Sequence, residues 1–382
     1  MTDLLGQHRF LQILNQLGKS ILLFLLVASS AFLLWKESEM PADLKCKTQA
    51  QAVPPSLFYN GQAIKLNLQT GQPVFSFPSL DISSRAGFGL ADQADPRFWA
   101  EQLNAGWYLD WKTDQRRNFQ YPEHWQMVRL FPGCVMPSNE AIRWLVLHYP
   151  GQTWIIGNEP DVILQDAVTA EQYAQTYHDL YYLIKSTDPT ARVAIAGVAQ
   201  PSPLRLEYLD LVLAAYQNSY HEQMPVDWWT VHGYVLREER DSWGADIPPG
   251  MTANQGQLYE VADNGRMDLF IQQIQAFRSW MARHGYRQIP LALTEFGIVM
   301  PADYGFPIDV KQQYLRDTFQ WLATATDAAT GFPQDGNRLV QRWAWFSLSY
   351  SPMPEADLAD LEAGKLTPIG QTFRDFVSGY QP

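Results

Sequence analysis

Short apolar segments alternate with amphipathic stretches through most of this chain after residue 84. The apolar segments are rich in β-branched and aromatic residues and are bounded by polar or turn-forming residues, which is typical of buried strands. We expect strands at eight places: Ala86–Leu90, Gly106–Trp111, Gln126–Phe131, Thr153–Gly157, Arg192–Gly197, Asp227–Gly233, Pro290–Glu295 and Val340–Phe346.

The amphipathic stretches between these strands have the spacing of helices, and Thr169 with Gln172 forms a capping-box pattern before one of them. We expect helices over Pro96–Leu103, Asn139–Tyr149, Ala170–Ser186, Leu204–Ser219, Arg266–His284 and Val310–Thr326. Strands that alternate with helices are joined by crossovers and therefore run parallel. Eight such units over about 300 residues predict an α/β protein with the (β/α)8 fold of a TIM barrel.

A doubly wound open sheet is the alternative architecture. It should carry a glycine-rich phosphate turn after its first strand, and Gly87-Phe88-Gly89 leads instead into Ala91-Asp92. One unit also departs from the ideal barrel, because residues 112–125 leave little room for a helix.

The residues before the barrel predict a membrane anchor. The run Ser20–Trp35 is apolar and uncharged, and it is just short of the ~17–25 residues of a spanning helix. A cleaved signal peptide is the alternative, but the small residues that would form its cleavage site lie inside the run. We expect a cytoplasmic tail (1–19), a single-pass transmembrane anchor (20–35), a stalk (36–55), a β-hairpin extension (56–83) and an extracellular barrel domain (84–382) at the plasma membrane.

Composition narrows the function classes. The chain has 382 residues, 46% of them hydrophobic, and a net charge of −12, which argues against a nucleic-acid partner. Its 14 Trp, 18 Tyr and 19 Phe would suit a carbohydrate site, because aromatic rings stack on the flat faces of sugars. No H-x-x-H or C-x-x-C pattern is found, so we expect no metal and no cofactor. We expect a monomer.

The chain has two cysteines, Cys46 and Cys134. They could form a disulfide outside the cytoplasm, but two cysteines do not make a disulfide framework, and two free thiols are the expectation.

Two glutamates carry the candidate chemistry. Glu159 and Glu295 each follow a short apolar run, so each lies at the carboxyl end of a predicted buried strand. A carboxylate there has lost much of its water and needs compensation. Glycoside hydrolysis requires two such carboxyl groups, one as proton donor and the other as nucleophile or base. Two unrelated acids that pair with arginines or cap helices are the alternative.

The residues around these glutamates resemble those of clan A glycoside hydrolases. Counted from Ala86, Glu159 closes strand four and Glu295 closes strand seven, as in the "4/7" retaining barrels. Residues 107–111 (WYLDW), 158–161 (NEPD) and 294–297 (TEFG) are most similar to the Asl1-like glycosyl hydrolase catalytic core, a family of endo-β-1,3-glucanases. The resemblance implies that Glu159 is the acid/base and Glu295 the nucleophile, and that the partner is a carbohydrate.

The resemblance also implies a set of substrate-binding residues. Asn158 would hydrogen-bond the sugar 2-hydroxyl, and Tyr234 would donate to Glu295 with His232 beside it. Trp345, at the end of strand eight, would form the floor of the sugar subsite and Trp111 its wall, and Asp110 belongs to the same motif as Trp111. Arg129 is a charge inside an apolar strand and needs a carboxylate partner. Glu295 is one candidate for that partner and a structural salt bridge is the other. The long loop 236–262 would rim the same face.

The leading hypothesis is therefore a retaining glycoside hydrolase that cleaves an extracellular β-linked glycan, with β-glucan favoured. A non-catalytic carbohydrate-binding or cell-envelope protein on a hydrolase-like barrel is the alternative, but a binding protein does not need both glutamates. An aldolase on the same barrel would require a strand-end lysine or a phosphate site after strands seven and eight, and neither is seen.

Overall fold

The computed structural model describes residues 81–113, 121–131 and 133–380. The expected tail (1–19), anchor (20–35) and stalk (36–55), and nearly all of the β-hairpin extension (56–83), lie outside these residues. Within the described ranges, no helix is both long and apolar enough to cross a membrane.

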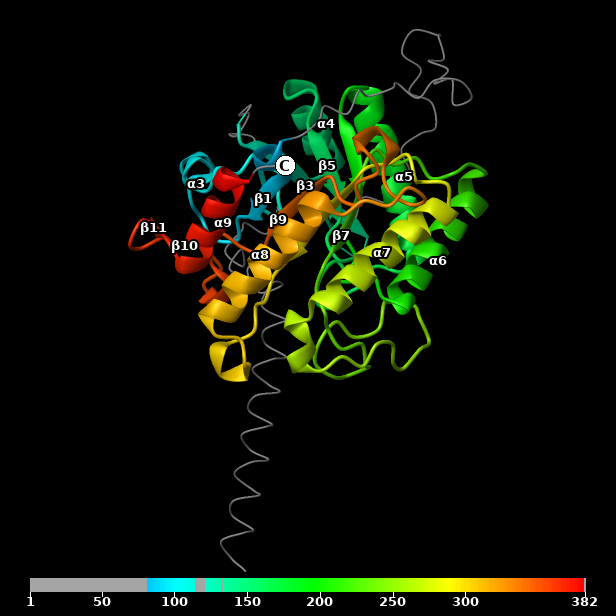
Figure 1. Cartoon of the computed structure of the whole chain (residues 1–382). Helices are drawn as coiled ribbons and strands as arrows, with labels where there is room; N and C mark the ends of the chain where they lie inside the picture. The colour runs from blue at the N-terminus through cyan, green and yellow to red at the C-terminus, as the bar shows by residue number, and fades with distance from the viewer. Residues whose placement is uncertain (1–80, 114–120, 132, 381–382) are drawn as a thin grey trace, which may run out of the picture.

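Eight parallel strands form the centre of the described part of the chain (Figure 1). They follow the spatial order β6-β5-β3-β2-β1-β9-β8-β7. The edge strands β6 and β7 meet through a parallel bridge between Ala194 and Trp228, with Ile195 N donating to Trp228 O at 3.2 Å. The expected barrel is therefore confirmed, and the open sheet is excluded. The strands are β1 Ala86–Gly89, β2 Trp107–Leu109, β3 Glu123–Phe131, β5 Thr153–Ile156, β6 Arg192–Ile195, β7 Trp229–His232, β8 Leu291–Phe296 and β9 Arg342–Trp345.

Helices surround the strands, and their starts follow from local capping residues (Figure 1). Asp95 and Ser202 accept hydrogen bonds from first-turn amides before a proline at the first helical position, and Thr169 and Gln172 complete the expected capping box. The long helices are α3 Pro96–Leu103, α4 Asn139–His148, α5 Ala170–Thr187, α6 Pro203–Tyr220, α7 Met267–Arg283, α8 Ile308–Thr324 and α9 Pro368–Gly379.

Several short elements and α9 were not expected from the sequence. Strand β4 (Cys134–Met136) pairs antiparallel with β3, and β10 (Ala359–Asp360) pairs with β11 (Lys365–Leu366) in the segment after β9. Helix α9 begins at Pro368 after the cap Thr367 and packs on α8 and α3. The remaining short helices are α2 Ile82–Arg85, η2 Val261–Gly265, η3 Ala302–Tyr304, η4 Pro333–Asp335 and η5 Pro354–Ala356.

Side chains of unequal size fill the barrel lumen. Trp107, Trp125 and Trp228 share it with alanines 194, 292 and 344, so that large rings from some strands face small side chains from others. At the amino ends of the strands, the Arg342 guanidinium lies 5.6–6.0 Å from the centroids of these three tryptophan rings. Arg342 Nη1 also donates to Glu123 Oε2 at 2.7 Å. The amino end of the barrel is thus closed by packing and charge, which leaves the carboxyl end for function.

Cys134, in β4, is disulfide-bonded. The expectation of two free thiols is therefore wrong. The other cysteine of the chain, Cys46, lies outside the described residues.

Candidate active site

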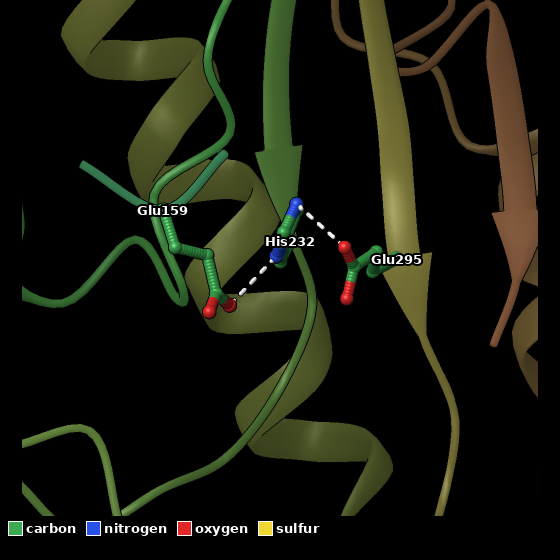
Figure 2. Close-up of side chains that lie close together, drawn as sticks. All are labelled: Glu159, His232 and Glu295. Atoms are coloured by element: carbon green, nitrogen blue, oxygen red, sulfur yellow. Dashed lines mark hydrogen bonds and ion pairs between the residues drawn. The ribbon is translucent and has the colours of Figure 1, made fainter. Parts of the chain in front are cut away.

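Glu159, His232 and Glu295 meet at the carboxyl ends of three strands (Figure 2). Glu159 lies in the turn after β5, His232 is the last residue of β7, and Glu295 is the second-to-last residue of β8. One carboxylate oxygen from each glutamate and one imidazole nitrogen all lie within 4.8 Å of one another. The three side chains are buried. The two glutamates, far apart in sequence, therefore face each other across one site.

His232 lies between the two carboxylates. Its Nδ1 is 2.8 Å from Oε1 of Glu159, and its Nε2 is 3.5 Å from Oε1 of Glu295. Burial lowers the pKa of His232, but the charges of Glu295 and Glu159 raise it by more, and the net shift is upward. The two carboxylates therefore favour the protonated imidazole over the neutral one, relative to a free histidine.

The carboxylate of Glu295 is held at both oxygens. Trp111 Nε1 donates to Oε1 at 2.6 Å, and the Tyr234 hydroxyl donates to Oε2 at 3.1 Å. Burial raises the pKa of Glu295; His232 lowers it and Glu159 raises it, and the two donors lower it without cancelling the upward shift. A carboxylate fixed in this way has its orientation set, as an attacking group requires.

Glu159 has an unusual backbone. Its φ of 42° lies in the left-handed region, which non-glycine residues adopt only where the surrounding structure holds them. Its amide donates to Gly197 O at 3.1 Å, and its carboxylate is bonded by His232. The turn after β5 therefore aims the Glu159 side chain toward Glu295.

Asn158 and Arg129 belong to a neighbouring polar network. Asn158 N donates to Asp166 Oδ2 at 2.7 Å, and Asn158 Nδ2 donates to Gln165 Oε1 at 3.3 Å. Asn158 Oδ1 is buried without a hydrogen-bond partner in the described part of the protein. Arg129 Nε is 2.7 Å from Asp166 Oδ1, so of the two expected alternatives the structure has the structural salt bridge, with Asp166 and not Glu295 as the partner.

Asp110 lies just beyond the end of β2, in a buried polar cluster. Strand β2 ends at Leu109, which packs in the lumen, and Trp111, whose φ of 55° interrupts the strand alternation, packs beside it. The Asp110 carboxylate is fully buried and lies 2.7 Å from His124 Nε2 and 3.8 Å from Lys112 Nζ. Its expected contact with substrate stays a prediction.

Trp345 is also turned away from the site. Ala344 faces the lumen, so Trp343 and Trp345 pack outward against the helices. Trp345 is 0% exposed, and its Nε1 donates to Ala356 O at 2.9 Å. Its indole therefore has no face available to a sugar, and the expected subsite floor is not formed by this residue.

Phe346 takes the position that was expected of Trp345. Its ring makes edge contacts with Trp111 at 5.5 Å, Tyr350 at 5.4 Å and Tyr234 at 6.5 Å between centroids. Trp111 and Tyr234 both donate to Glu295, so Phe346 lies beside the nucleophile candidate. The sequence signal for it was the strict alternation Trp343, Ala344, Trp345, Phe346, which puts Phe346 on the face of the small residue.

Glu159, His232 and Glu295 are also the one group of residues in the described ranges whose ligand atoms lie close enough together to hold a metal ion. Hydrogen bonds from Trp111 and Tyr234 already engage both Glu295 oxygens, and the imidazole is bonded to Glu159. These contacts suit one carboxylate held in a fixed orientation beside a second carboxyl group that can exchange a proton.

No protein-family model matches this sequence, and no curated protein matches it. Solved structures do share the fold. An endo-β-1,3-glucanase of GH128 subgroup II from Pseudomonas viridiflava has a TM-score of 0.53 at 18% identity, over 76% of this chain and 97% of its own. The subgroup II endo-β-1,3-glucanase from Sorangium cellulosum has a TM-score of 0.53 at 17% identity, over 78% and 99%.

A curdlan-specific exo-β-1,3-glucanase of GH128 subgroup III from Blastomyces gilchristii has a TM-score of 0.52 at 16% identity, over 77% of this chain and 99% of its own. At these identities the likeness establishes the barrel fold, and the activity has to be argued from the site.

Proposed function

We propose that this chain is a retaining glycoside hydrolase in which Glu159 is the acid/base and Glu295 the nucleophile. The observation that carries the proposal is that one oxygen of the Glu159 carboxylate and one oxygen of the Glu295 carboxylate lie within 4.8 Å of each other at the carboxyl end of the barrel. Retaining enzymes separate these groups by about 5–5.5 Å, whereas inverting enzymes need about 6.5–9.5 Å to admit a water molecule. The spacing here supports direct attack by Glu295.

The two steps assign different work to the two acids. In the first step, a Glu295 oxygen attacks the anomeric carbon while Glu159 gives its proton to the leaving glycosidic oxygen. In the second step, Glu159 takes a proton from water, which attacks the anomeric carbon and releases Glu295. Trp111 and Tyr234 keep the attacking carboxylate oriented, and His232 lies between the two carboxyl groups and contacts both.

We favour a β-glucan, and β-1,3-linked glucan in particular, as the substrate. The support is the shared fold of three solved β-1,3-glucanases together with a polar and an aromatic group at the site. Asn158 Oδ1 has no hydrogen-bond partner among residues 81–113, 121–131 and 133–380, and it could accept a hydrogen bond from a sugar hydroxyl. Phe346 provides an aromatic edge beside Glu295.

We also propose that the enzyme acts outside the cytoplasm and is held there by residues 20–35. The support is the uncharged apolar run Ser20–Trp35 and the disulfide at Cys134, since disulfides persist in oxidising compartments. Sequencing of the mature protein tests this proposal. A new amino terminus near residues 30–45 would mean that the segment is a cleaved signal peptide.

The activity is tested by incubating the purified protein with β-1,3-, β-1,4- and mixed-linkage glucans, xylan and mannan. We expect hydrolysis of β-1,3-glucan, with the β-anomer as the first product seen by proton NMR. Glu295→Gln should abolish turnover, because an amide cannot form the covalent glycosyl-enzyme. Binding of glucan by both proteins without hydrolysis by either would favour a non-catalytic carbohydrate-binding protein instead.

A further inference from the structure

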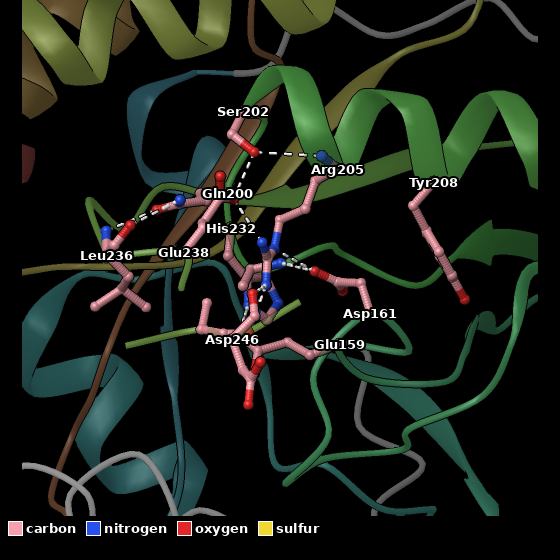
Figure 3. Close-up of polar contacts among 12 residues, drawn as sticks. Glu159, Asp161, Gln200, Ser202, Arg205, Tyr208, His232, Leu236, Glu238 and Asp246 are labelled. Carbon is pink, nitrogen blue, oxygen red and sulfur yellow. Dashed lines mark hydrogen bonds and ion pairs between the residues drawn. The ribbon is translucent and has the colours of Figure 1, made fainter. Parts of the chain in front are cut away.

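Arg205 joins two segments that border the candidate site, and its side chain is fully buried (Figure 3). It lies in the first turn of α6. Its Nε is 2.6 Å from Asp161 Oδ2, and its Nη1 is 2.5 Å from Glu238 Oε1. Asp161 belongs to the turn that carries Glu159, whereas Glu238 belongs to the long loop between β7 and η2. One guanidinium thus holds a carboxylate from each segment.

In the turn after β5, which carries Glu159, the residue that pairs with Arg205 is Asp161. It follows Glu159 by two residues, and its Oδ2 also accepts the Ala199 amide at 3.2 Å. The Glu159 amide donates to Gly197 O on the same neighbouring segment. Burial raises the pKa of Asp161 to about 6, so its carboxyl is ionised at neutral pH and can pair with Arg205. These contacts supply the restraint that the left-handed φ of Glu159 requires.

In the long loop after β7, the Glu238 carboxylate accepts hydrogen bonds from several donors. Its Oε1 accepts the Ser202 hydroxyl at 2.5 Å and its Oε2 accepts the Gln257 amide at 2.8 Å. Arg205 Nη2 also donates to Ala245 O at 2.7 Å. The guanidinium that pairs with Asp161 therefore also binds the loop directly at Glu238 and Ala245, and it reaches Gln257 through the Glu238 carboxylate.

We propose that Arg205 and Asp161 are positioning residues that hold the Glu159 carboxyl in place and couple it to the loop of residues 236–257; this rests on the proposed role of Glu159. Asp161, Arg205 and Glu238 form a triad of buried charges. Stability alone does not explain it, since replacing such a triad with apolar side chains is often neutral or stabilising. The triad is instead explained by the two segments it connects. Loss of the coupling should impair steps that need Glu159 and spare those that do not.

The kinetic test compares two substrates that differ in their need for protonation. Laminarin has a poor leaving group, whereas 2,4-dinitrophenyl β-laminaribioside releases its phenol without help. A displacement of about 1 Å can cost on the order of 10²-fold in rate. We expect Asp161→Asn and Arg205→Lys to lower kcat/KM for laminarin roughly 10–100-fold and to change kcat/KM for the aryl glycoside by less than about threefold. Global loosening would lower both together, and that result would overturn the proposal.

A second measurement does not depend on activity. Hydrogen–deuterium exchange of Arg205→Lys should show faster uptake in both 157–162 and 236–257, because lysine cannot bridge the two carboxylates as the guanidinium does. The matched control is Asp227→Asn, which breaks the salt bridge to Lys185 (3.1 Å) at the opposite end of the barrel and should affect neither segment nor activity. Faster uptake in one segment alone would overturn the coupling. If the wild type hydrolyses neither substrate, the proposed function fails while the exchange result still decides the coupling.

Discussion

The indole Nε1 of Trp111 donates a 2.6 Å hydrogen bond to Oε1 of Glu295. Trp111 follows β2, the second strand of the barrel, whereas Glu295 lies near the end of β8, the seventh, and the contact joins them across the site. Trp111 reaches it with a φ of 55°, in the left-handed region. A strained backbone and a charge-assisted hydrogen bond at the same residue indicate a contact that the fold maintains for Glu295.

Trp111→Phe removes this donor and keeps an aromatic ring. The hydrogen bond lowers the pKa of Glu295, so its loss should raise that pKa further and leave less ionised nucleophile at acid pH. We therefore expect the acid limb of the kcat/KM profile for laminarin to move to higher pH. At the optimum, kcat/KM should fall about tenfold or more, as for other hydrogen bonds to charged groups.

The matched control for this prediction is Trp280→Phe. Trp280 Nε1 donates to Asp210 Oδ1 at the same 2.6 Å, but on the outer helices. It should leave the pH profile unchanged. A profile of Trp111→Phe that coincides with the wild type would mean that the indole does not influence the nucleophile.

Phe346→Leu and Trp345→Phe form a second pair of variants, and we expect them to have opposite effects on KM and Tm. Phe346→Leu keeps the apolar volume but removes the ring beside Trp111 and Tyr234, so KM for laminarin should rise with a small change in Tm. Trp345→Phe deletes part of a fully buried side chain, so Tm should fall while KM stays the same. Steady-state kinetics and thermal unfolding of both variants show which of the two side chains contacts substrate. The reverse pattern would restore Trp345 as the residue that contacts substrate.

The barrel and most helix starts were predictable because their signals are local. Asp95 with Pro96, and Thr169 with Gln172, are caps that the sequence contains within one turn. The two glutamates were also predictable, because each directly follows the apolar run of its own strand. In the fold, that position alone brings them to one end of the barrel.

The direction of individual side chains at strand ends was harder to predict. Trp345 was expected in the site, but its side chain is turned away, and that of Phe346, one residue further on, lies beside Trp111 and Tyr234 instead. An error of one residue reverses the face, because side chains alternate along a strand. The triad of Asp161, Arg205 and Glu238 could not have been foreseen, since its members come from the turn after β5, the first turn of α6 and the loop after β7, and their approach depends on the closed barrel.

Glu123 is predicted to make stability depend on pH. Burial raises its pKa, but the positive charges of Arg342 and Arg192 more than offset this, and the net shift is downward from 4.5. A carboxyl whose pKa is lowered by folding contributes stability above its unfolded pKa, and the contribution is lost as pH falls through the folded value. The free energy of unfolding of Glu123→Gln should therefore be below that of the wild type at pH 7.

Urea unfolding at pH 7 and at about pH 3 checks this prediction, because the difference between the two proteins should shrink on acidification. Hydrolysis of laminarin near neutral pH should survive in Glu123→Gln, since the residue lies at the amino end of the barrel. A difference in unfolding free energy that stays constant with pH would show that the ion pair with Arg342 does not set it.

The final prediction separates the two carboxylates by the product each variant makes. Glu159→Ala should lose nearly all activity on laminarin, because general acid help is typically worth about 10²–10⁴ in rate. It should still form the glycosyl-enzyme from 2,4-dinitrophenyl β-laminaribioside, whose leaving group needs no proton. Azide, a small anion that needs no general base, should then attack that intermediate and yield a β-glycosyl azide.

The same change at the other acid should give the opposite anomer. Glu295→Ala leaves a cavity below the anomeric carbon, and azide entering it should yield the α-glycosyl azide by a single inversion. NMR of the isolated azides reads the anomeric configuration directly. The same anomer from both variants, or wild-type activity on laminarin in either, would remove the assignment of nucleophile and acid/base made here.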